Sequence, residues 1–242
     1  MTWSLNCAAV IPCFDEAATI AGLVGRLRIT LPTVVVVDDG SSDGTAAAAA
    51  AAGGQVLRHE RNRGKGAALR TGCHRAWEEG FRWALLLDGD GQHAPADVPA
   101  FFDAAESSGA TLLVGNRMGQ ATAMPWLRRA VNRWMSQQLS RRAGLRLPDS
   151  QCGFRLIRLD TWVTLPLRAN RFEIESEMLL AVLAAGHKVE FVPIQVLPSL
   201  RPSRIHPVLD AWRWWRWWRG GLAAGAAAAM RPGITVTSGP AA

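Results

Sequence analysis

The chain has 242 residues and a formal net charge of +7 at pH 7, so one large domain, or one domain with an appendage, and an anionic partner (a phosphorylated substrate, a nucleic acid or an anionic membrane) are expected. It contains no apolar run of about 18 residues and no basic region before its N-terminal apolar residues, which argues against a transmembrane helix and a signal peptide. Its 4 cysteines show no paired CxxC spacing, which favours reduced thiols in the cytoplasm over a zinc site or disulfides.

The first half of the chain alternates short apolar runs with amphipathic segments. We predict strands at residues 8–12, 33–37, 55–58, 84–87 and 111–114. Helices are predicted at 17–29, within 41–54, from about 65 and from 95. This alternation predicts an α/β fold in which a doubly wound, mostly parallel sheet is flanked by helices.

The pattern changes after Pro125. A helix is predicted there, with an apolar face made of Trp126, Leu127, Ala130, Val131, Trp134, Met135 and Leu139. Its other face carries Arg128, Arg129, Asn132, Arg133, Ser136 and Arg141. We expect the apolar face to be buried and the other face to present a cationic strip. Further along, 153–157 and 188–196 are predicted strands, and 173–185 is a predicted helix.

The sequence WRWWRWWR at 212–219 sets the C-terminal region apart. On a helical wheel Arg213, Arg216 and Arg219 share one arc, and most of the tryptophans lie opposite. Such a helix fits a membrane interface, although the tryptophans could instead pack on the protein's own core. We therefore expect a main domain over 1–206, an amphipathic helix over 207–230 and a disordered tail over 231–242.

Two aspartates, Asp88 and Asp90, follow the predicted strand at 84–87. Open α/β sheets bind their ligands at the carboxyl ends of the strands. Two carboxylates this close repel each other unless a cation lies between them, and a divalent ion with phosphate oxygens is a common solution. Gln92 and His93 add potential ligands. A plain turn is the alternative, because Asp-Gly is frequent in turns.

Other loops are expected at the same edge of the sheet. They are CFDE at 13–16, DDGSSDGT at 38–45 and GNR at 115–117. Pro12, Phe14 and Glu16 could hold a nucleobase, and Asp39 could accept a hydrogen bond from a ring N–H or a ribose hydroxyl. Arg117 could neutralise phosphate charge through two parallel hydrogen bonds. The grouping predicts one site for a nucleotide, a diphosphate and a metal ion.

Four motifs carry a family resemblance: VIPCFDEAATI, VVVVDDGSSDGT, NRGKGAALRTG and LLLDGDGQH. In order and spacing they resemble the inverting family-2 nucleotide-sugar glycosyltransferases of GT-A fold, in particular the branch of dolichyl-phosphate mannose synthases and bacterial polyprenyl-phosphate relatives. The segments at 149–158 and 171–179 resemble later motifs of that branch, so the likeness covers roughly 8–206. It implies that this region is a GT-A catalytic domain. The implied reaction is metal-dependent transfer of a hexose from a GDP- or UDP-linked donor to a membrane-associated acceptor, most simply polyprenyl phosphate.

The resemblance also implies roles for individual residues. The nucleoside pocket would be lined by Pro12, Phe14, Glu16, Asp38 and Asp39. The metal ion, Mg²⁺ or Mn²⁺, would be coordinated by Asp88, Asp90 and Gln92. The diphosphate and an anionic acceptor would be contacted by Lys65, Arg117, Arg129, Arg133, Arg201 and Arg204.

The need for a catalytic base depends on the acceptor. A lipid phosphate is already anionic near pH 7 and needs positioning for in-line attack on the anomeric carbon. A hydroxyl on another lipid or on a small molecule would need a carboxylate to take its proton. Asp149 is the first candidate for that role, with Glu173 or Glu175 next. The glutamates equally suit the first turn of a helix.

Three other classes of protein fit the sequence less well. A nucleotidyltransferase would normally carry a glycine-rich phosphate loop after the first strand, which CFDEAAT lacks. A basic nucleic-acid-binding protein fits the charge, but no recognisable reading module is present. The intact Asp-Gly-Asp argues against a non-catalytic relative. The expected partners are therefore a nucleotide-sugar, a lipid acceptor and an anionic membrane, with no nucleic acid, on the cytoplasmic face of the membrane.

Overall fold

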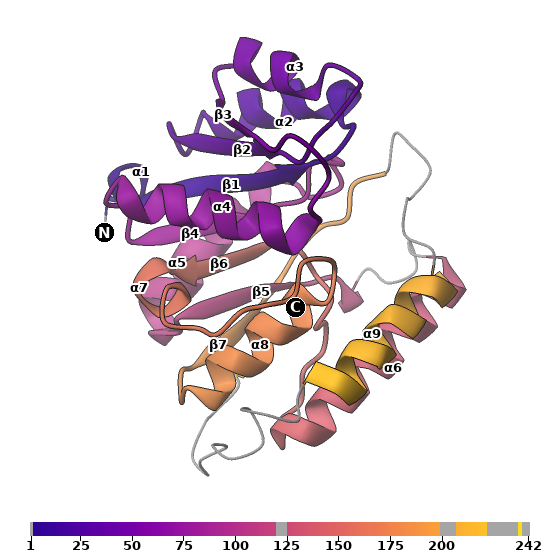
Figure 1. Ribbon diagram of the computed structural model, residues 1–242. Coiled ribbons are helices and arrows are strands. Elements are labelled where there is room, and N and C mark those ends of the chain that lie inside the picture. Colours follow the sequence, from indigo (N-terminus) through magenta and orange to yellow (C-terminus); the bar gives the residue numbers. More distant parts are fainter. Residues whose placement is uncertain (1, 120–124, 199–206, 222–236, 239–242) are drawn as a thin grey trace.

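A computed structural model describes residues 2–119, 125–198, 207–221 and 237–238 (Figure 1). Within these residues an eight-stranded sheet has the order β3-β2-β1-β4-β6-β5-β7-β8. Its strands are β1 (Cys7–Cys13), β2 (Val34–Asp38), β3 (Gln55–Arg58), β4 (Trp83–Leu86), β5 (Leu112–Asn116), β6 (Arg155–Arg158), β7 (Val189–Pro193) and β8 (Thr237–Ser238). Strand β6 is antiparallel to β4 and β5, and the other neighbouring strands are parallel. The predicted α/β class with a mostly parallel sheet is confirmed.

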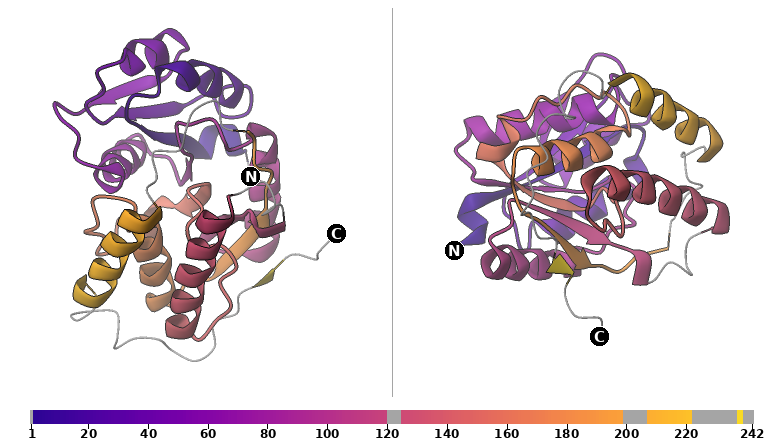
Figure 2. Two further views of the ribbon diagram at one scale, coloured as in Figure 1. Left: turned by 90° about the vertical axis from the view of Figure 1, so that its right-hand side faces the viewer. Right: turned by 90° about the horizontal axis from the view of Figure 1, so that it is seen from below.

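Helices cover both faces of this sheet (Figure 2). They are α1 (Trp3–Asn6), α2 (Ala17–Leu27), α3 (Thr45–Ala51), α4 (Lys65–Glu78), the short 3-10 helix η1 (Pro95–Asp97), α5 (Val98–Ser108), α6 (Trp126–Ala143), α7 (Leu159–Trp162), α8 (Ile174–Ala184) and α9 (Pro207–Gly221). No described helix is both long and apolar enough to cross a membrane.

The strands β1, β2 and β4 are mostly apolar because both faces of the sheet are covered. In β2 all five residues, VVVVD, are buried. Helix α4 packs closely on the strands at Gly72, where an added Cβ would lie 2.4 Å from Cγ1 of Val10. A glycine is therefore required at this contact. The close packing fixes the first turn of α4, with Lys65, at the carboxyl end of the sheet.

Helices α6 and α9 lie side by side on one outer side of the molecule (Figure 2). The predicted faces of α6 are wrong in part: Trp126, Leu127 and Trp134 are 73%, 38% and 40% exposed, whereas Asn132 and Ser136 are buried. The reason is that the two polar side chains have buried partners. Asn132 donates a 3.0 Å hydrogen bond to Asp149, and the hydroxyls of Ser136 and Ser150 lie 2.9 Å apart.

Other differences lie at the ends of elements and in the C-terminal region. The short helices α1 and α7 were not predicted, because four residues are too few to show a helical period. Within the tail that was expected to be disordered, Thr237 and Ser238 pair with β7. The other residues of 231–242 lie outside the described residues.

Candidate active site

The first two strand-end loops are joined by hydrogen bonds at the carboxyl edge of the sheet. The backbone N–H groups of Asp15 and Glu16 each donate a 2.8 Å bond, to Oγ of Ser41 and Oγ1 of Thr45. Asp15 in turn accepts a 2.9 Å bond from the N–H of Ser42, and its φ of 52° lies in the left-handed region. Because aspartate tolerates that region better than most residues, Asp15 can hold the loop that carries half-exposed Phe14.

The two consecutive aspartates after β2 are buried and bound to the protein. Asp38 accepts a 2.9 Å bond from the N–H of Ser41 and lies 3.3 Å from Nε of Arg58. Asp39 accepts bonds of 2.9 Å and 2.7 Å from the N–H groups of Arg63 and Gly64, and Nδ1 of His59 lies 2.6 Å from its Oδ1. Asp39 therefore positions the loop that leads into α4.

The predicted nucleoside pocket accordingly divides into two groups. Pro12, Phe14 and Glu16 are partly exposed beside this edge, whereas Asp38 and Asp39 are buried. Contact between any of these residues and a nucleoside stays a prediction. For Asp39, that contact would use the one oxygen, Oδ2, that accepts a single bond here.

Asp88 and Asp90 follow β4, but their surroundings differ. Asp88 forms an ion pair with Lys65, whose Nζ also lies 2.5 Å from Oε1 of Glu175. Burial alone would raise the pKa of Asp88, but Lys65 holds it well below its usual range. Burial and the nearby Asp88 raise the pKa of Asp90. Asp90 accepts two hydrogen bonds from Gln92, 3.0 Å from its backbone N–H and 2.7 Å from its side-chain amide.

The donor set at this position fits a hard divalent cation. Among the described residues no group of three or more His, Cys, Asp or Glu side chains could hold a metal ion by itself. Two carboxylates are what Mg²⁺ commonly takes from a protein when phosphate oxygens and water complete its shell. Asp88 and Asp90 are thus the residues that could hold the ion, and the side chain of Gln92 would have to turn its oxygen outward to join them.

Backbone close to the aspartates leaves no room for a further side chain. An added Cβ at Gly153 would lie 2.5 Å from Oδ2 of Asp88 and 2.8 Å from Nζ of Lys65. His93 is buried on the other side, where its Nδ1 accepts a 3.3 Å bond from the N–H of Asp88. Burial lowers the pKa of His93 to about 4, so the imidazole is neutral near pH 7.

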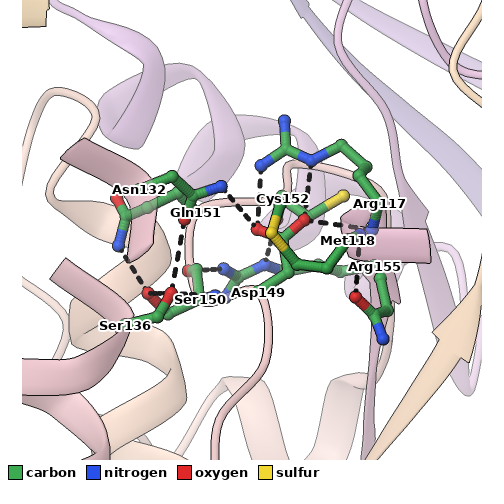
Figure 3. Close-up of polar contacts among 10 residues, drawn as sticks. Arg117, Met118, Asn132, Ser136, Asp149, Ser150, Gln151, Cys152 and Arg155 are labelled. Carbon is green, nitrogen blue, oxygen red and sulfur yellow. Dashed lines mark hydrogen bonds and ion pairs between the residues drawn. The ribbon is translucent and has the colours of Figure 1, made fainter. Parts of the chain in front are cut away.

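Arg117 and Asp149 form a buried, two-point ion pair (Figure 3). Nε of Arg117 donates to one oxygen of Asp149 at 2.7 Å and Nη2 donates to the other at 2.9 Å. Asp149 is fully buried, and although burial would raise its pKa, Arg117 lowers it. Because Arg117 and Asn132 bind its oxygens away from solvent, Asp149 is poorly placed to act as a catalytic base, and that role stays a prediction. Asp149 positions Arg117.

A fully buried arginine that the sequence analysis did not single out organises the segment after Asp149. The guanidinium of Arg155 donates three bonds of 2.7–2.8 Å to the backbone carbonyl groups of Ser150, Cys152 and Glu175. Figure 3 shows Arg155 beside Ser150 and Cys152, and the bond to Glu175 ties this segment to the start of α8. The sequence signal was the arginine after a glycine and an aromatic residue, but nothing in the pattern indicated that its side chain points inward.

A cleft opens from Asp88 and Lys65 toward α6, α8 and α9. Polar residues in its lining are Lys65, Asp88, Arg117, Arg128, Asn132, Gln151, Arg171, Glu173, Glu175 and Arg213. Its apolar lining is Val131, Met135, Phe172, Ala211 and Trp214.

The structure brings only some of the predicted cationic residues to this cleft. From the cationic strip of α6, Arg128 lines it and Arg129 does not, while Arg133 lines a separate groove on α6 with Arg141 and Arg146. Arg201 and Arg204 lie outside the described residues. Sequence analysis missed Arg128, Arg171, Arg213 and Trp214 as parts of the site.

Comparison with known proteins decides the family. The model of glycosyl transferase family 2 matches residues 8–161. This chain belongs to glycosyl transferase family 2. The predicted resemblance is confirmed, and the chain is thereby assigned to a family of glycosyltransferases.

Named relatives of this family-2 chain include two proteins that act on lipid phosphates. It is 31% identical over 147 residues to a UDP-N-acetylglucosamine–dolichyl-phosphate N-acetylglucosaminyltransferase of Methanococcus voltae, a match that covers 59% of each protein. It is 30% identical over 199 residues to an undecaprenyl-phosphate mannosyltransferase of Micrococcus luteus, covering 76% of this chain and 81% of the relative. The chain thus spans well under two thirds of the length of the first of these relatives.

A solved structure with the same fold is glucosyl-3-phosphoglycerate synthase of Mycobacterium tuberculosis in complex with Mn²⁺, UDP and glucosyl-3-phosphoglycerate. The TM-score is 0.69 at 20% sequence identity, and the match covers 86% of this chain and 76% of the synthase. The predicted GT-A fold is confirmed by this likeness.

Proposed function

We propose that this family-2 protein transfers a hexose, with inversion, from a GDP- or UDP-linked sugar to a phosphate-headed lipid, most simply a polyprenyl phosphate. The observation that carries the proposal is the cleft beside Asp88. Its lining carries five cationic and three carboxylate side chains, and α6 and α9 add an apolar part made of Val131, Met135, Ala211 and Trp214. A lipid phosphate has the same two-part character. The relatives named for dolichyl phosphate and undecaprenyl phosphate support this choice of acceptor.

Positioning residues account for most of the proposed chemistry. The phosphate oxygen of the acceptor attacks the anomeric carbon while the bond from that carbon to the nucleoside diphosphate breaks. Arg117 is locked by Asp149 in one orientation and stabilises negative charge without reorganising during the reaction. A phosphate acceptor needs no base. If a hydroxyl were the acceptor, Glu173 or Glu175, which both line the cleft, would be the carboxylate to take its proton.

A divalent ion fits the proposal. Asp88 and Asp90 would hold Mg²⁺ or Mn²⁺, which supplies positive charge to the leaving diphosphate. The structural neighbours that were solved with UDP and either Mn²⁺ or Mg²⁺ support a metal of this kind.

The test is a transfer assay with GDP- and UDP-linked hexoses, Mn²⁺ and a short-chain polyprenyl phosphate in detergent. We expect sugar transfer that needs the metal and falls at least about a hundredfold in Asp90→Asn, in line with the loss of an electrostatic group at a reaction centre. The control is Asp103→Asn, on the exposed side of α5. Equal rates for the two variants, or donor binding without transfer to the lipid, would contradict the proposal.

We also propose that α6 and α9 rest on an anionic membrane. The tryptophan face, defined as Trp126 and Trp134 of α6 with Trp212 and Trp215 of α9, is 39–73% exposed. Exposed indoles suit the depth of lipid headgroups, and the net charge of +7 favours anionic lipid. Flotation with vesicles that contain anionic lipid is the test. Trp212→Ala combined with Trp215→Ala should reduce binding to the vesicles. Unchanged binding would contradict the proposed contact between these helices and a membrane.

A further inference from the structure

We propose that α9 supplies the acceptor subsite of the cleft: Arg213 binds the phosphate group of the acceptor, and Trp214 with Ala211 binds the first apolar part of its chain. This inference rests on the proposed function and adds to it a role for a helix outside the region matched by the family model, which ends at residue 161. From the sequence this helix was expected to lie on a membrane or to pack its tryptophans on the protein's own core.

Helix α9 has a defined register against the rest of the described domain. Trp214 is 2% exposed, and its Nε1 donates a 2.8 Å hydrogen bond to Oγ of Ser176 in α8. The same hydroxyl accepts a 2.9 Å bond from the side-chain amide of Gln151, which also lines the cleft. One buried tryptophan therefore fixes the helix beside the cleft. Its neighbour in sequence, Arg213, lines the cleft as a result.

The cleft lining contains five cationic side chains. The two cations nearest the aspartates already face carboxylates: Lys65 pairs with Asp88 and Glu175, and Arg117 pairs with Asp149. Three further cations in the lining come from separate elements, namely Arg128 of α6, Arg171 before α8 and Arg213 of α9. A phosphate monoester carries about 1.5 to 2 negative charges at pH 7. Cations that converge from several directions suit such a group.

Apolar side chains of α6 and α9 form another part of the cleft lining. Val131 and Met135 of α6 and Ala211 and Trp214 of α9 all line the cleft. Trp134 of α6 lies with its ring centroid 5.4 Å from that of Trp214 and is itself 40% exposed. Apolar surface is therefore continuous from the cleft to the tryptophan face. A lipid with its phosphate at Arg213 could leave the protein along this path.

The experiment compares Arg213→Gln with Arg216→Gln in the full-length chain. Arg216 lies one turn further along α9 and is exposed, so it is a matched control. With a short-chain polyprenyl phosphate in detergent, Arg213→Gln should raise the KM for the acceptor about tenfold or more, the usual effect of losing a hydrogen bond to a charged group. The KM for the donor should stay within about twofold of the parent value, since the donor binds elsewhere in the cleft. Arg213→Lys should recover part of the loss, and Arg216→Gln should match the parent.

The outcomes separate this inference from the proposed function. If the parent transfers sugar to polyprenyl phosphate but Arg213→Gln and Arg216→Gln behave alike, the acceptor subsite on α9 is wrong and the proposed function stands. An equal rise in the KM for donor and acceptor would also overturn it, because a general distortion of the cleft would then explain the loss. If the parent binds the nucleotide-sugar but transfers nothing to polyprenyl phosphate, the proposed function and the inference both fail.

Discussion

Lys65 and Asp88 form an ion pair at the carboxyl edge of the sheet, where the lysine also contacts Glu175. One ammonium group thus holds two carboxylates that belong to different halves of the chain. Lys65 comes from the first turn of α4, and Glu175 lies in the first turn of α8. The pair therefore contributes to the fold as well as to the candidate metal site.

Removal of this ammonium should destabilise the protein. Lys65→Met leaves Asp88 and Glu175 without their shared cation, so we expect the free energy of unfolding to fall by about 3–5 kcal/mol in urea denaturation. The matched control is Lys188→Met, which removes a single 3.1 Å hydrogen bond to the carbonyl of Ser108 and should cost about 1 kcal/mol. A similar loss of unfolding free energy in both variants would show that the Lys65 ion pairs stabilise the protein no more than a single hydrogen bond does.

A side chain at Gly153 should displace the Asp88 carboxylate or the Lys65 ammonium group. In Gly153→Ala the new Cβ would lie 2.5 Å from the Asp88 carboxylate and 2.8 Å from Lys65, so one of them must move. We expect Mn²⁺ affinity, measured by calorimetry with the nucleoside diphosphate present, to fall about tenfold or more, as for changes beside metal ligands. Gly25→Ala in α2, where an added Cβ meets nothing within 4 Å, should bind Mn²⁺ like the parent. Normal affinity in Gly153→Ala would contradict the close approach of this backbone to Asp88.

His93 should make the metal-free protein sensitive to acid. Its pKa falls from 6.5 to about 4 on folding, chiefly because of burial, so the unfolded state binds a proton that the folded state does not bind between these values. The contribution of His93 to the free energy of unfolding, about 3 kcal/mol, is fully present above pH 6.5. It is lost as the pH falls toward 4. The measurement is urea denaturation from about pH 7.5 to about pH 4.5 with chelator, a range that spans most of this loss. His93→Gln should flatten the profile, and exposed His74→Gln should not.

Trp214 and Trp215 should have opposite effects although they are neighbours. Trp214 is buried and bonded to Ser176, so Trp214→Ala should lower the free energy of unfolding by about 3–5 kcal/mol. Trp215 is 39% exposed, so Trp215→Ala should cost less than about 1 kcal/mol but should reduce binding to anionic vesicles. Urea denaturation and flotation, carried out on both variants, check the pair. If the same variant shows the larger loss in both stability and vesicle binding, the assignment of Trp214 to the core and of Trp215 to the membrane would be contradicted.

Periodicity and turn chemistry were sufficient to locate most elements of the first half of the chain. The strand at 55–58 and the start of α4 at Lys65 lie where they were predicted. Strand direction was not predictable, because an apolar run has the same pattern in either direction. The antiparallel placement of β6 between β4 and β5 follows from pairings with residues that are distant in the sequence, such as Leu86 with Arg155.

The candidate site was predictable where one loop supplies the chemistry and not where two distant segments meet. Asp88 and Asp90 stand together in the sequence, so their role in a shared site could be proposed at once. The pairing of Arg117 with Asp149 joins residues 32 positions apart, and it makes the expected base one side of an ion pair. The predicted faces of α6 are wrong in part for a similar reason, since Asn132 is buried where it donates a hydrogen bond to Asp149.

Most of the cleft lining comes from the part of the chain that follows β5. Two of its lining residues, Lys65 and Asp88, precede residue 94, and most of the others belong to α6, α8 and α9 or lie just before α8. Substitutions in the later helices could therefore change which molecule receives the sugar while the sugar donor stays the same. A lineage could thus acquire new products by drifting in the part of its chain that follows β5.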